Sequence, residues 1–389
     1  MVVKLGGKAL SEGERARQLA EKINFELKDG KKVVVIVSAV GDTTDRLIDY
    51  SAKACNGEIS LKDLDEILAM GERTSARVFT AALKAHGVNA KFLDPLDGDW
   101  PIITDDNFGN ANPIEDECIS RIRGKIEKMF SENITPVVPG FIGKTKHGEI
   151  TTLGRGGSDT TAFLVGKALG ASEVLLVTDV DGILSADPKI VPNPERIKEI
   201  SAEKLMYLCD VGNKFLHRKA LKFLDGSFKV RVTSYKFERL DYEGTLIKGF
   251  ANKNSTSKQN KLLAALTILT ENASDTSDIS EVCSTILQAT TRNKIPVLML
   301  TADINALILY VHDKDAQKTA RILHYDLLSN GKGKILSIAV KRGVTWTKIP
   351  FMEEENIRKE IGTLKTCEGK LFSIFTIASD IHVLTEQKS

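Results

Sequence analysis

Short apolar stretches alternate with amphipathic stretches along the first part of the chain. Val2–Leu5, Val33–Val37 and Val174–Thr178 are runs of mostly β-branched and aliphatic residues, typical of strands that are buried on both faces. Between the first two lies a segment, residues 12–28, whose apolar residues recur with the period of a helix. This alternation predicts an α/β fold with a mostly parallel sheet that helices cover on both sides. Further strands are expected at Lys91–Leu93 and Pro136–Phe141, and further helices at Asp45–Ala54 and Leu61–His86.

The composition indicates a globular protein of more than one domain. The chain has 389 residues, of which 42% are hydrophobic and 27% are charged. A net charge of +2 gives no reason to expect a nucleic-acid or membrane partner, and no apolar run approaches the ~20 residues of a membrane span. Residues 1–7 do not have the pattern of a signal peptide. Five cysteines stand singly, so we expect reduced, buried thiols in a cytoplasmic protein: Cys55, Cys118, Cys209, Cys283 and Cys367.

Residues 151–161 read Thr-Thr-Leu-Gly-Arg-Gly-Gly-Ser-Asp-Thr-Thr and lead into a helical pattern at Ala162–Leu169. A glycine-rich turn before a helix presents free backbone N–H groups and the positive end of the helix dipole, so it suits an anion. Arg155 adds a planar fork for a carboxylate or phosphate. Asp159 would instead hold a lysine or a metal ion. The alternative is a tight turn in which Ser158 or Asp159 only caps the helix.

Other polar groups follow the predicted strands at the point where each strand ends. Lys4 and Gly6-Gly7 end the first strand, Ser38 follows the second, and Thr178-Asp179 ends a third. Ligands of parallel sheets bind outside the carboxyl ends of the strands, and lysine, paired glycines, hydroxyls and aspartates there describe a phosphate site. The chain contains neither Gly-x-x-x-x-Gly-Lys-Ser/Thr nor a Gly-x-Gly-x-x-Gly that opens a helix, so the P-loop and dinucleotide-binding classes are disfavoured.

Taken in order, these segments resemble the aspartokinases, a family with the amino acid kinase fold. The segments are Lys4–Gly7, Ser38-Ala39, Thr43–Asp45, Gly71-Glu72, Thr152–Ala162, Thr178–Gly182, Ala186–Pro188 and Lys214–His217. The resemblance covers about residues 1–250. Glutamate 5-kinase, acetylglutamate kinase and uridylate kinase share the fold without the Leu-Gly-Arg-Gly-Gly-Ser-Asp string, which is therefore the family-specific signal.

The resemblance implies an ATP-dependent phosphotransferase that phosphorylates the side-chain carboxylate of L-aspartate and so begins the synthesis of lysine, threonine and methionine. It assigns catalysis to Lys4, on the transferring phosphoryl group, and to Asp159, which orients Lys4 or orders magnesium. Mg²⁺ would arrive with ATP, and no protein ligands are assigned to it. Such chemistry needs positioning and charge neutralisation more than covalent help.

The resemblance also divides the remaining site residues between the two substrates. Arg155 would hold the α-carboxylate of aspartate and Glu72 its α-ammonium, with hydroxyls from Ser38, Thr44 and Ser158. The nucleotide would be bound by Lys4, Gly6, Gly7, Thr178, Asp179, Lys189, Lys214 and Phe215. His217 receives no role.

One departure from the family pattern keeps other hypotheses open. Lys8-Ala9 stands where aspartokinases usually have Thr-Ser, so one substrate-side hydroxyl is missing. Lys8 would either contact a phosphate or point to solvent. The alternatives are another acyl-phosphate kinase of this fold, acting on glutamate or a derivative, and a catalytically weakened regulatory relative. Retention of Lys4 and Asp159 argues against the second.

The character of the sequence changes after residue 250. Residues 251–261 are polar and indicate a linker, so we expect a catalytic domain at 1–250 and a second region at 262–389. Strands are expected at Leu262–Leu269, Pro296–Leu300, Ala306–Val311, Ile335–Val340, Phe372–Ile377 and Ile381–Thr385, and helices at Ile279–Thr291 and Ala316–Leu328. The order β-α-β-β-α is that of a ferredoxin-like unit, with a second, less regular copy after it.

The resemblance implies that this region is a tandem pair of ACT domains, which regulate aspartokinases. We expect a homodimer, or a dimer of dimers, formed through it. Effector loops of ACT domains usually contain a glycine, and residues 271–275 contain none. Weak inhibition by lysine and threonine is therefore expected.

Overall fold

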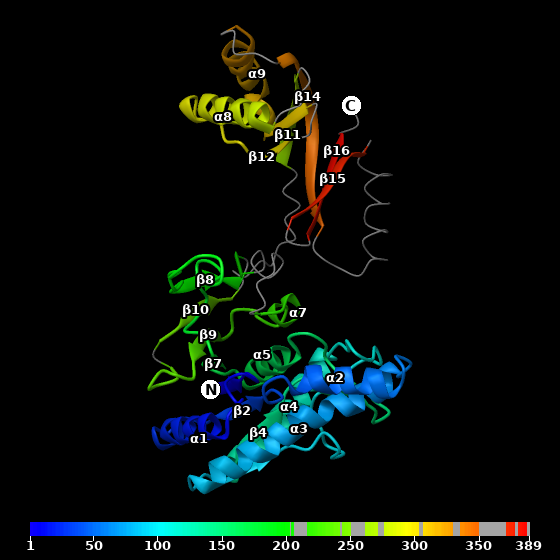
Figure 1. Ribbon diagram of the computed structural model, residues 1–389, viewed down its shortest axis with the longest axis vertical. Coiled ribbons are helices and arrows are strands. Elements are labelled where there is room, and N and C mark those ends of the chain that lie inside the picture. The colour runs from blue at the N-terminus through cyan, green and yellow to red at the C-terminus, as the bar shows by residue number, and fades with distance from the viewer. Residues whose placement is uncertain are drawn as a thin grey trace. The chain divides into compact units, whose positions relative to one another are not determined.

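The structure is a computed structural model and is drawn in Figure 1. It describes residues 1–202, 204–205, 216–241, 243–249, 261–270, 276–302, 306–329, 335–349, 371–377 and 380–386. Contacts within the chain divide it into two units, Met1–Asn254 and Ser255–Ser389. The loop 271–275, Lys214 and Phe215 lie outside the described residues, as does the predicted linker 251–261 apart from Lys261, which is the first residue of a strand.

An eight-stranded sheet forms the centre of the first unit, with the order β3-β4-β2-β1-β7-β9-β10-β8. Its neighbouring strands are parallel except for β9 and β10. The strands are β1 (Val2–Leu5), β2 (Val34–Val37), β3 (Ala90–Phe92), β4 (Thr135–Pro139), β7 (Glu173–Thr178), β8 (Glu199–Ser201), β9 (Lys229–Ser234) and β10 (Thr245–Lys248). The expected mostly parallel sheet is confirmed.

Helices cover both faces of this sheet. Successive residues of each strand point to opposite sides, so each strand contributes apolar side chains to both faces. Val2, Val34 and Leu176 pack against α4, α5 and α7 in one core cluster. Val3 and Val35 pack against α1 and α3 in the other. The helices are α1 (Gly13–Lys28), α2 (Thr43–Ala54), α3 (Leu61–Ala85), α4 (Glu115–Ser131), α5 (Gly157–Leu169) and α7 (Arg218–Leu221).

Some elements differ from the sequence-based expectations. Helix α5 begins at Gly157, so half of the glycine-rich string belongs to the helix rather than to the turn before it. Strand β4 ends at Pro139 instead of Phe141, because the chain turns there and Phe141 takes a positive φ of 67°. Helix α4 and the hairpin of β5 (Ile142–Lys144) and β6 (Ile150–Thr152) were not predicted.

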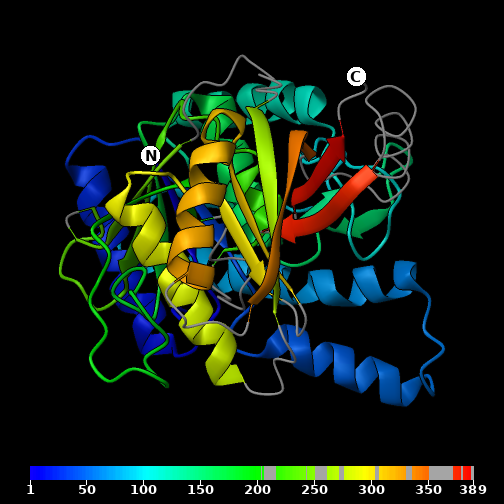
Figure 2. The ribbon, with the colours of Figure 1, turned by 90° about the horizontal axis from the view of Figure 1, so that it is seen from above.

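The second unit contains a six-stranded sheet of order β12-β13-β11-β14-β16-β15. Its first four strands have the spatial order of a ferredoxin-like unit, and α8 and α9 lie on one face (Figures 1 and 2). The elements are β11 (Lys261–Thr270), α8 (Thr276–Arg292), β12 (Met299–Ala302), β13 (Ala306–His312), α9 (Ala316–His324), a π-helical turn (Tyr325–Ser329), β14 (Ile335–Ile349), β15 (Leu371–Ile377) and β16 (Asp380–Glu386).

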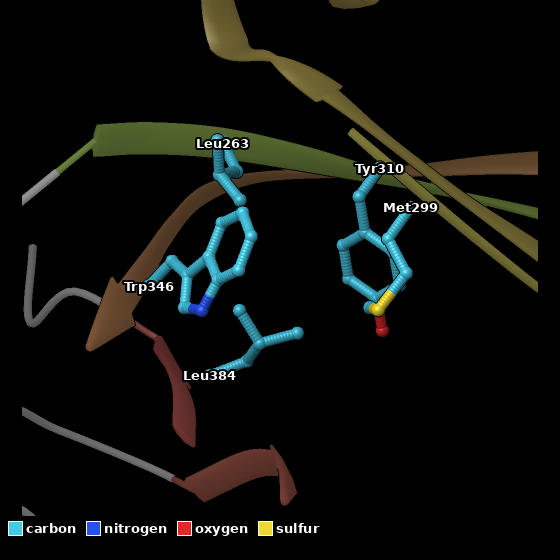
Figure 3. A pocket seen from close by; sticks show the side chains of 5 residues that line it. All are labelled: Leu263, Met299, Tyr310, Trp346 and Leu384. Atoms are coloured by element: carbon cyan, nitrogen blue, oxygen red, sulfur yellow. The ribbon is translucent and has the colours of Figure 1, made fainter. Parts of the chain in front are cut away.

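Strand β14 corrects the expectation of a short strand that ends at Val340. It runs on to Ile349 and pairs with β11 along one part and with β16 along another. A single strand therefore continues the first ferredoxin-like unit into the second set of strands. On the sheet face opposite α8, the side chains of Leu263, Met299, Tyr310, Trp346 and Leu384 line a small pocket (Figure 3). This lining is apolar apart from one hydroxyl and one indole, so it offers nothing for phosphoryl transfer.

Two further expectations concern cysteines and membranes. Cys118 is buried and Cys283 half-buried, but Cys55 is exposed, so the expectation of a buried thiol is wrong there. Cys55 is the first residue beyond α2, and Ser51 is the buried residue of that helix. Cys209 and Cys367 lie outside the described residues. Among the described helices, none combines the length and the apolar character that crossing a bilayer requires.

Candidate functional site

The register of the central sheet brings the polar strand ends to one edge. Leu5 lies level with Val37 on one side and with Val177 on the other. The residues that follow these three are therefore neighbours. Gly6 donates its N–H to the Val177 carbonyl at 2.9 Å, and Ser38 donates to the Leu5 carbonyl at 3.1 Å. The structure confirms the expected convergence at the carboxyl ends of parallel strands.

Lys4 lies on the sheet face that α5 covers, because it alternates with Val3 and Leu5, which face the other way. Its Nζ lies 2.7 Å from Oδ1 of Asp159, in the first turn of α5. The two side chains are 15% and 10% exposed. Both charges are thus largely shielded from water but not fully enclosed. A buried pair of this kind holds a lysine ammonium in one position.

The turn after β1 is a cradle for an anion. A side chain at Gly7 would collide with the carbonyl oxygen of Ala39, so only glycine lets these backbones approach. Among the described residues, the backbone N–H groups of Gly7 and Lys8 have no acceptor. The Lys8 side chain is 76% exposed and its Nζ lies 3.3 Å from Oδ2 of Asp179, after β7. Free N–H groups and an exposed cation fit the phosphates of a nucleotide.

Glu72 reaches the same edge from α3, on the opposite face of the sheet. Gly71 allows this, because a side chain there would press against Ala39 at 3.0 Å. One Glu72 oxygen accepts the Ala39 N–H at 3.1 Å. The other oxygen is buried and has no partner among the described residues. Glu72 is 3% exposed, and this burial raises its pKa to about 7. A bound cation would complete its hydrogen bonding.

The glycine-rich string forms a tight turn into α5. Gly156 adopts the left-handed conformation (φ 72°) and packs against His217, so the turn needs glycine there. Arg155 is exposed, and no hydrogen bond or ion pair ties its guanidinium to any described residue. Ser158 is buried beside Gly140, which follows β4. The N–H groups of Ser158 and Asp159 likewise have no acceptor within the described part of the chain.

The other predicted residues are less tightly gathered. Ser38 is half-buried at the edge, and Thr44 is half-buried in the first turn of α2. Thr178 Oγ1 lies 3.1 Å from Oδ1 of Asp179. Lys189 is exposed in the segment after β7, and no side-chain contact with the described residues brings it to the edge. Its backbone N–H donates to Asp187 at 2.9 Å. Over the described residues, no three acidic, histidine or cysteine side chains gather as a metal-binding group.

Two ionisable residues near the turn were not predicted. Asp65, on α3, is 1% exposed and accepts the N–H groups of Gly109 and Thr152, both at 2.9 Å. Burial raises the pKa of its carboxyl. Lys219, on α7, contacts backbone carbonyls of two loops. In the sequence both resemble the solvated charges of ordinary helices, and most of their partners are backbone groups, so no residue pattern marks them.

The model of the amino acid kinase family matches residues 1–234, which is more than half of the chain. The chain therefore belongs to the amino acid kinase family. Among curated proteins it is 37% identical over 253 residues to the aspartokinase of Corynebacterium efficiens, covering 64% of this chain and 57% of that protein. It is 35% identical over 253 residues to an aspartokinase of Thermus thermophilus, covering 64% and 60%. The chain thus matches less than two thirds of the length of these relatives.

Solved structures share the fold. The aspartate kinase from Synechocystis superposes with a TM-score of 0.79 at 22% identity, covering 99% of this chain and 66% of that one. E. coli aspartokinase III in complex with aspartate and ADP gives a TM-score of 0.57 at 22% identity, covering 99% and 96%. At this identity the likeness shows the architecture alone.

Proposed function

We propose that the chain is an aspartokinase, which transfers the γ-phosphoryl group of ATP to the side-chain carboxylate of L-aspartate and yields 4-phospho-L-aspartate and ADP. Two comparisons support this substrate pair. The curated relatives are aspartokinases, and one solved structure of the same fold binds aspartate and ADP. The protein would act in the cytoplasm at the start of lysine, threonine and methionine synthesis.

The observation that carries the proposal is the state of Glu72. Within the described residues, one oxygen of this buried carboxylate has no partner, and the nearby turn has N–H groups without acceptors. Such a buried carboxylate is costly unless a ligand completes its hydrogen bonding. A free α-ammonium group supplies both the charge and the donors. The exposed guanidinium of Arg155 suits the α-carboxylate of the same ligand. Glu72 and Arg155 together favour a free amino acid over an acylated one.

The proposed mechanism needs no general base, because the attacking carboxylate is already ionised. Its oxygen forms a bond to the γ-phosphorus while the bond from that phosphorus to the bridging oxygen of ADP breaks. Lys4 stabilises the charge on the moving phosphoryl group, and Asp159 fixes the Lys4 ammonium. The N–H groups of Gly7 and Lys8 would bind phosphate oxygens. Magnesium bound to ATP would neutralise part of the phosphate charge.

The remaining assignments belong to the same proposal. Ser38, Thr44 and Ser158 would offer hydroxyls to the substrates, with Gly6 beside the phosphates. Thr178, Asp179, Lys189, Lys214 and Phe215 would contact the nucleotide. The ion pair between Lys8 and Asp179 joins the segments that follow β1 and β7. It would break when a phosphate binds Lys8. The domain assignment, a catalytic domain at 1–250 and an ACT-like region at 262–389 that mediates dimerisation, also remains a proposal.

One assay tests the proposal against its alternatives. ADP release is measured with L-aspartate, L-glutamate and N-acetyl-L-glutamate in parallel, with ATP and Mg²⁺. We expect turnover with L-aspartate and much less with the other two. Preference for glutamate would establish another acyl-phosphate kinase of this fold. Absence of turnover with all three would point to a regulatory relative.

A further inference from the structure

The ammonium of Lys219 is surrounded by carbonyl oxygens rather than by carboxylates. Its Nζ lies 2.7 Å from the Ala111 oxygen, 2.9 Å from the Leu153 oxygen, and 3.1 and 3.0 Å from the backbone and side-chain oxygens of Asn110. Lysine has three donors and no acceptor, so these contacts use its full capacity. Burial lowers the pKa of Lys219 to about 8, since no carboxylate among the described residues pairs with it directly.

These contacts join three segments that are far apart in the sequence. Lys219 comes from α7, Asn110 and Ala111 come from the loop between β3 and α4, and Leu153 begins the glycine-rich turn. From the other side, Asp65 accepts N–H groups of Gly109 and Thr152. The loop and the turn are thus held by one half-buried cation and one buried anion.

The same contacts surround the base of Arg155. Leu153 and Gly154 precede it, and a side chain at Gly154 would lie 2.5 Å from the Asn110 amide oxygen. Gly156 follows it and packs against His217, two residues before Lys219. The backbone on both sides of Arg155 therefore rests on α7 and on the Asn110 loop. The guanidinium itself is tied to no described residue, so its position depends on that backbone.

We propose that Lys219 is a positioning residue that aims Arg155 at the carboxylate of the amino-acid substrate. The inference rests on the proposed function for the identity of that substrate. Lys219 does not touch the substrate; it holds the turn from which Arg155 projects. A misplaced guanidinium would lose its paired hydrogen bonds to the carboxylate. Loss of Lys219 should therefore weaken binding of the amino acid and leave binding of ATP unchanged.

Lys219→Met tests this, because it keeps the length of the side chain and removes its charge and donors. We expect the KM for L-aspartate to rise about 10-fold or more, the cost of one charge-assisted hydrogen bond, with the KM for ATP within twofold. Lys222→Met is the matched control, an exposed lysine at the end of the same helix; it should change neither. In an Arg155→Lys background, Lys219→Met should raise the KM for L-aspartate by a further factor of less than two. The guanidinium that Lys219 positions is already absent from that variant.

An unchanged KM for L-aspartate in Lys219→Met, or a full multiplicative effect in the Arg155→Lys background, would overturn the inference. Should Lys219→Met fail to fold, Lys219→Gln keeps an amide donor and gives the same comparison. Amide hydrogen exchange without substrate separates this inference from the proposed function. Residues 107–112 and 153–156 should exchange faster in Lys219→Met than in Lys222→Met, whichever amino acid the enzyme accepts. Equal exchange would show that Lys219 does not hold the turn.

Discussion

Glu72 is a residue whose ionisation would favour binding of the proposed substrate but disfavours folding. Its pKa is raised from 4.5 to about 7 by burial, so the native state binds its proton more tightly than the unfolded chain does. This contribution to stability is present below pH 4.5 and is lost as the pH rises through about 7. The α-ammonium of a substrate would need the ionised form, which is the less stable one in the free protein.

Glu72→Gln removes this titration while keeping an oxygen for the Ala39 N–H. The stability of the variant relative to wild type, from urea unfolding, should be about 2 kcal/mol greater at pH 8.5 than at pH 5.5. Its KM for L-aspartate should rise at least about 10-fold at pH 8.5, because a charged partner is lost. A stability difference that does not vary with pH would show that Glu72 titrates normally.

Lys4→Ala tests the residue that we propose to stabilise the transferring phosphoryl group. Removing one preorganised charge should lower kcat by about 100-fold or more. Lys53→Ala is the control: Lys53 is an exposed lysine on α2 whose ion pair with Asp49 lies on the surface, and kcat should change little. A Lys4→Ala variant that retains a third of the wild-type kcat would remove Lys4 from the mechanism.

At the scale of an element, helix α5 has a left-handed glycine at each end. Gly156 is its N-cap residue, with φ 72°, and Gly170 is its C-cap residue, with φ 57°. A side chain at Gly170 would meet open space, whereas one at Gly156 would collide with His217. Substitution at Gly170 therefore measures the loss of stability from backbone strain alone. Substitution at Gly156 adds the effect of displacing the segment that carries Arg155 and Asp159.

Gly170→Ala should cost about 1 kcal/mol of stability by thermal or urea unfolding and leave kinetics unchanged. Gly156→Ala should cost more than this and also raise the KM for L-aspartate, because the turn must move away from His217. Both effects are measured on the same preparations. Equal kinetics in the two variants would mean that the turn tolerates displacement and that Arg155 is not positioned by it.

The elements differ in how far the sequence predicts them. Strands β1, β2 and β7 were predictable because a strand buried on both faces has a nearly continuous apolar sequence. Helix α4 was missed, although Cys118, Ile122 and Ile126 recur on one of its faces. The same reasoning explains the site: strand-end residues such as Lys4 follow from topology, but Lys219 does not, because most of its partners are backbone carbonyl groups, which every residue has.

At the scale of the whole molecule, we predict a homodimer that lysine and threonine inhibit weakly. The six-stranded sheet of the second unit ends in β12 and β15, and open sheet edges are normally paired or covered. Residues 271–275 lack the glycine that would let an effector approach the backbone. Activity with millimolar lysine or threonine should stay within about twofold, below the ~5-fold of typical allosteric coupling. A monomer by light scattering, or strong inhibition by either amino acid, would contradict this.

The central claim is that a free amino acid receives a phosphoryl group on its side-chain carboxylate, and the product itself tests it most directly. The protein is incubated with ATP, Mg²⁺, L-aspartate and hydroxylamine, which converts an acyl phosphate into a stable hydroxamate, and the product is identified by mass spectrometry. We expect the side-chain hydroxamate of aspartate, formed in equal amount to ADP and absent with Lys4→Ala. ADP without hydroxamate, or a hydroxamate from glutamate alone, would contradict the account.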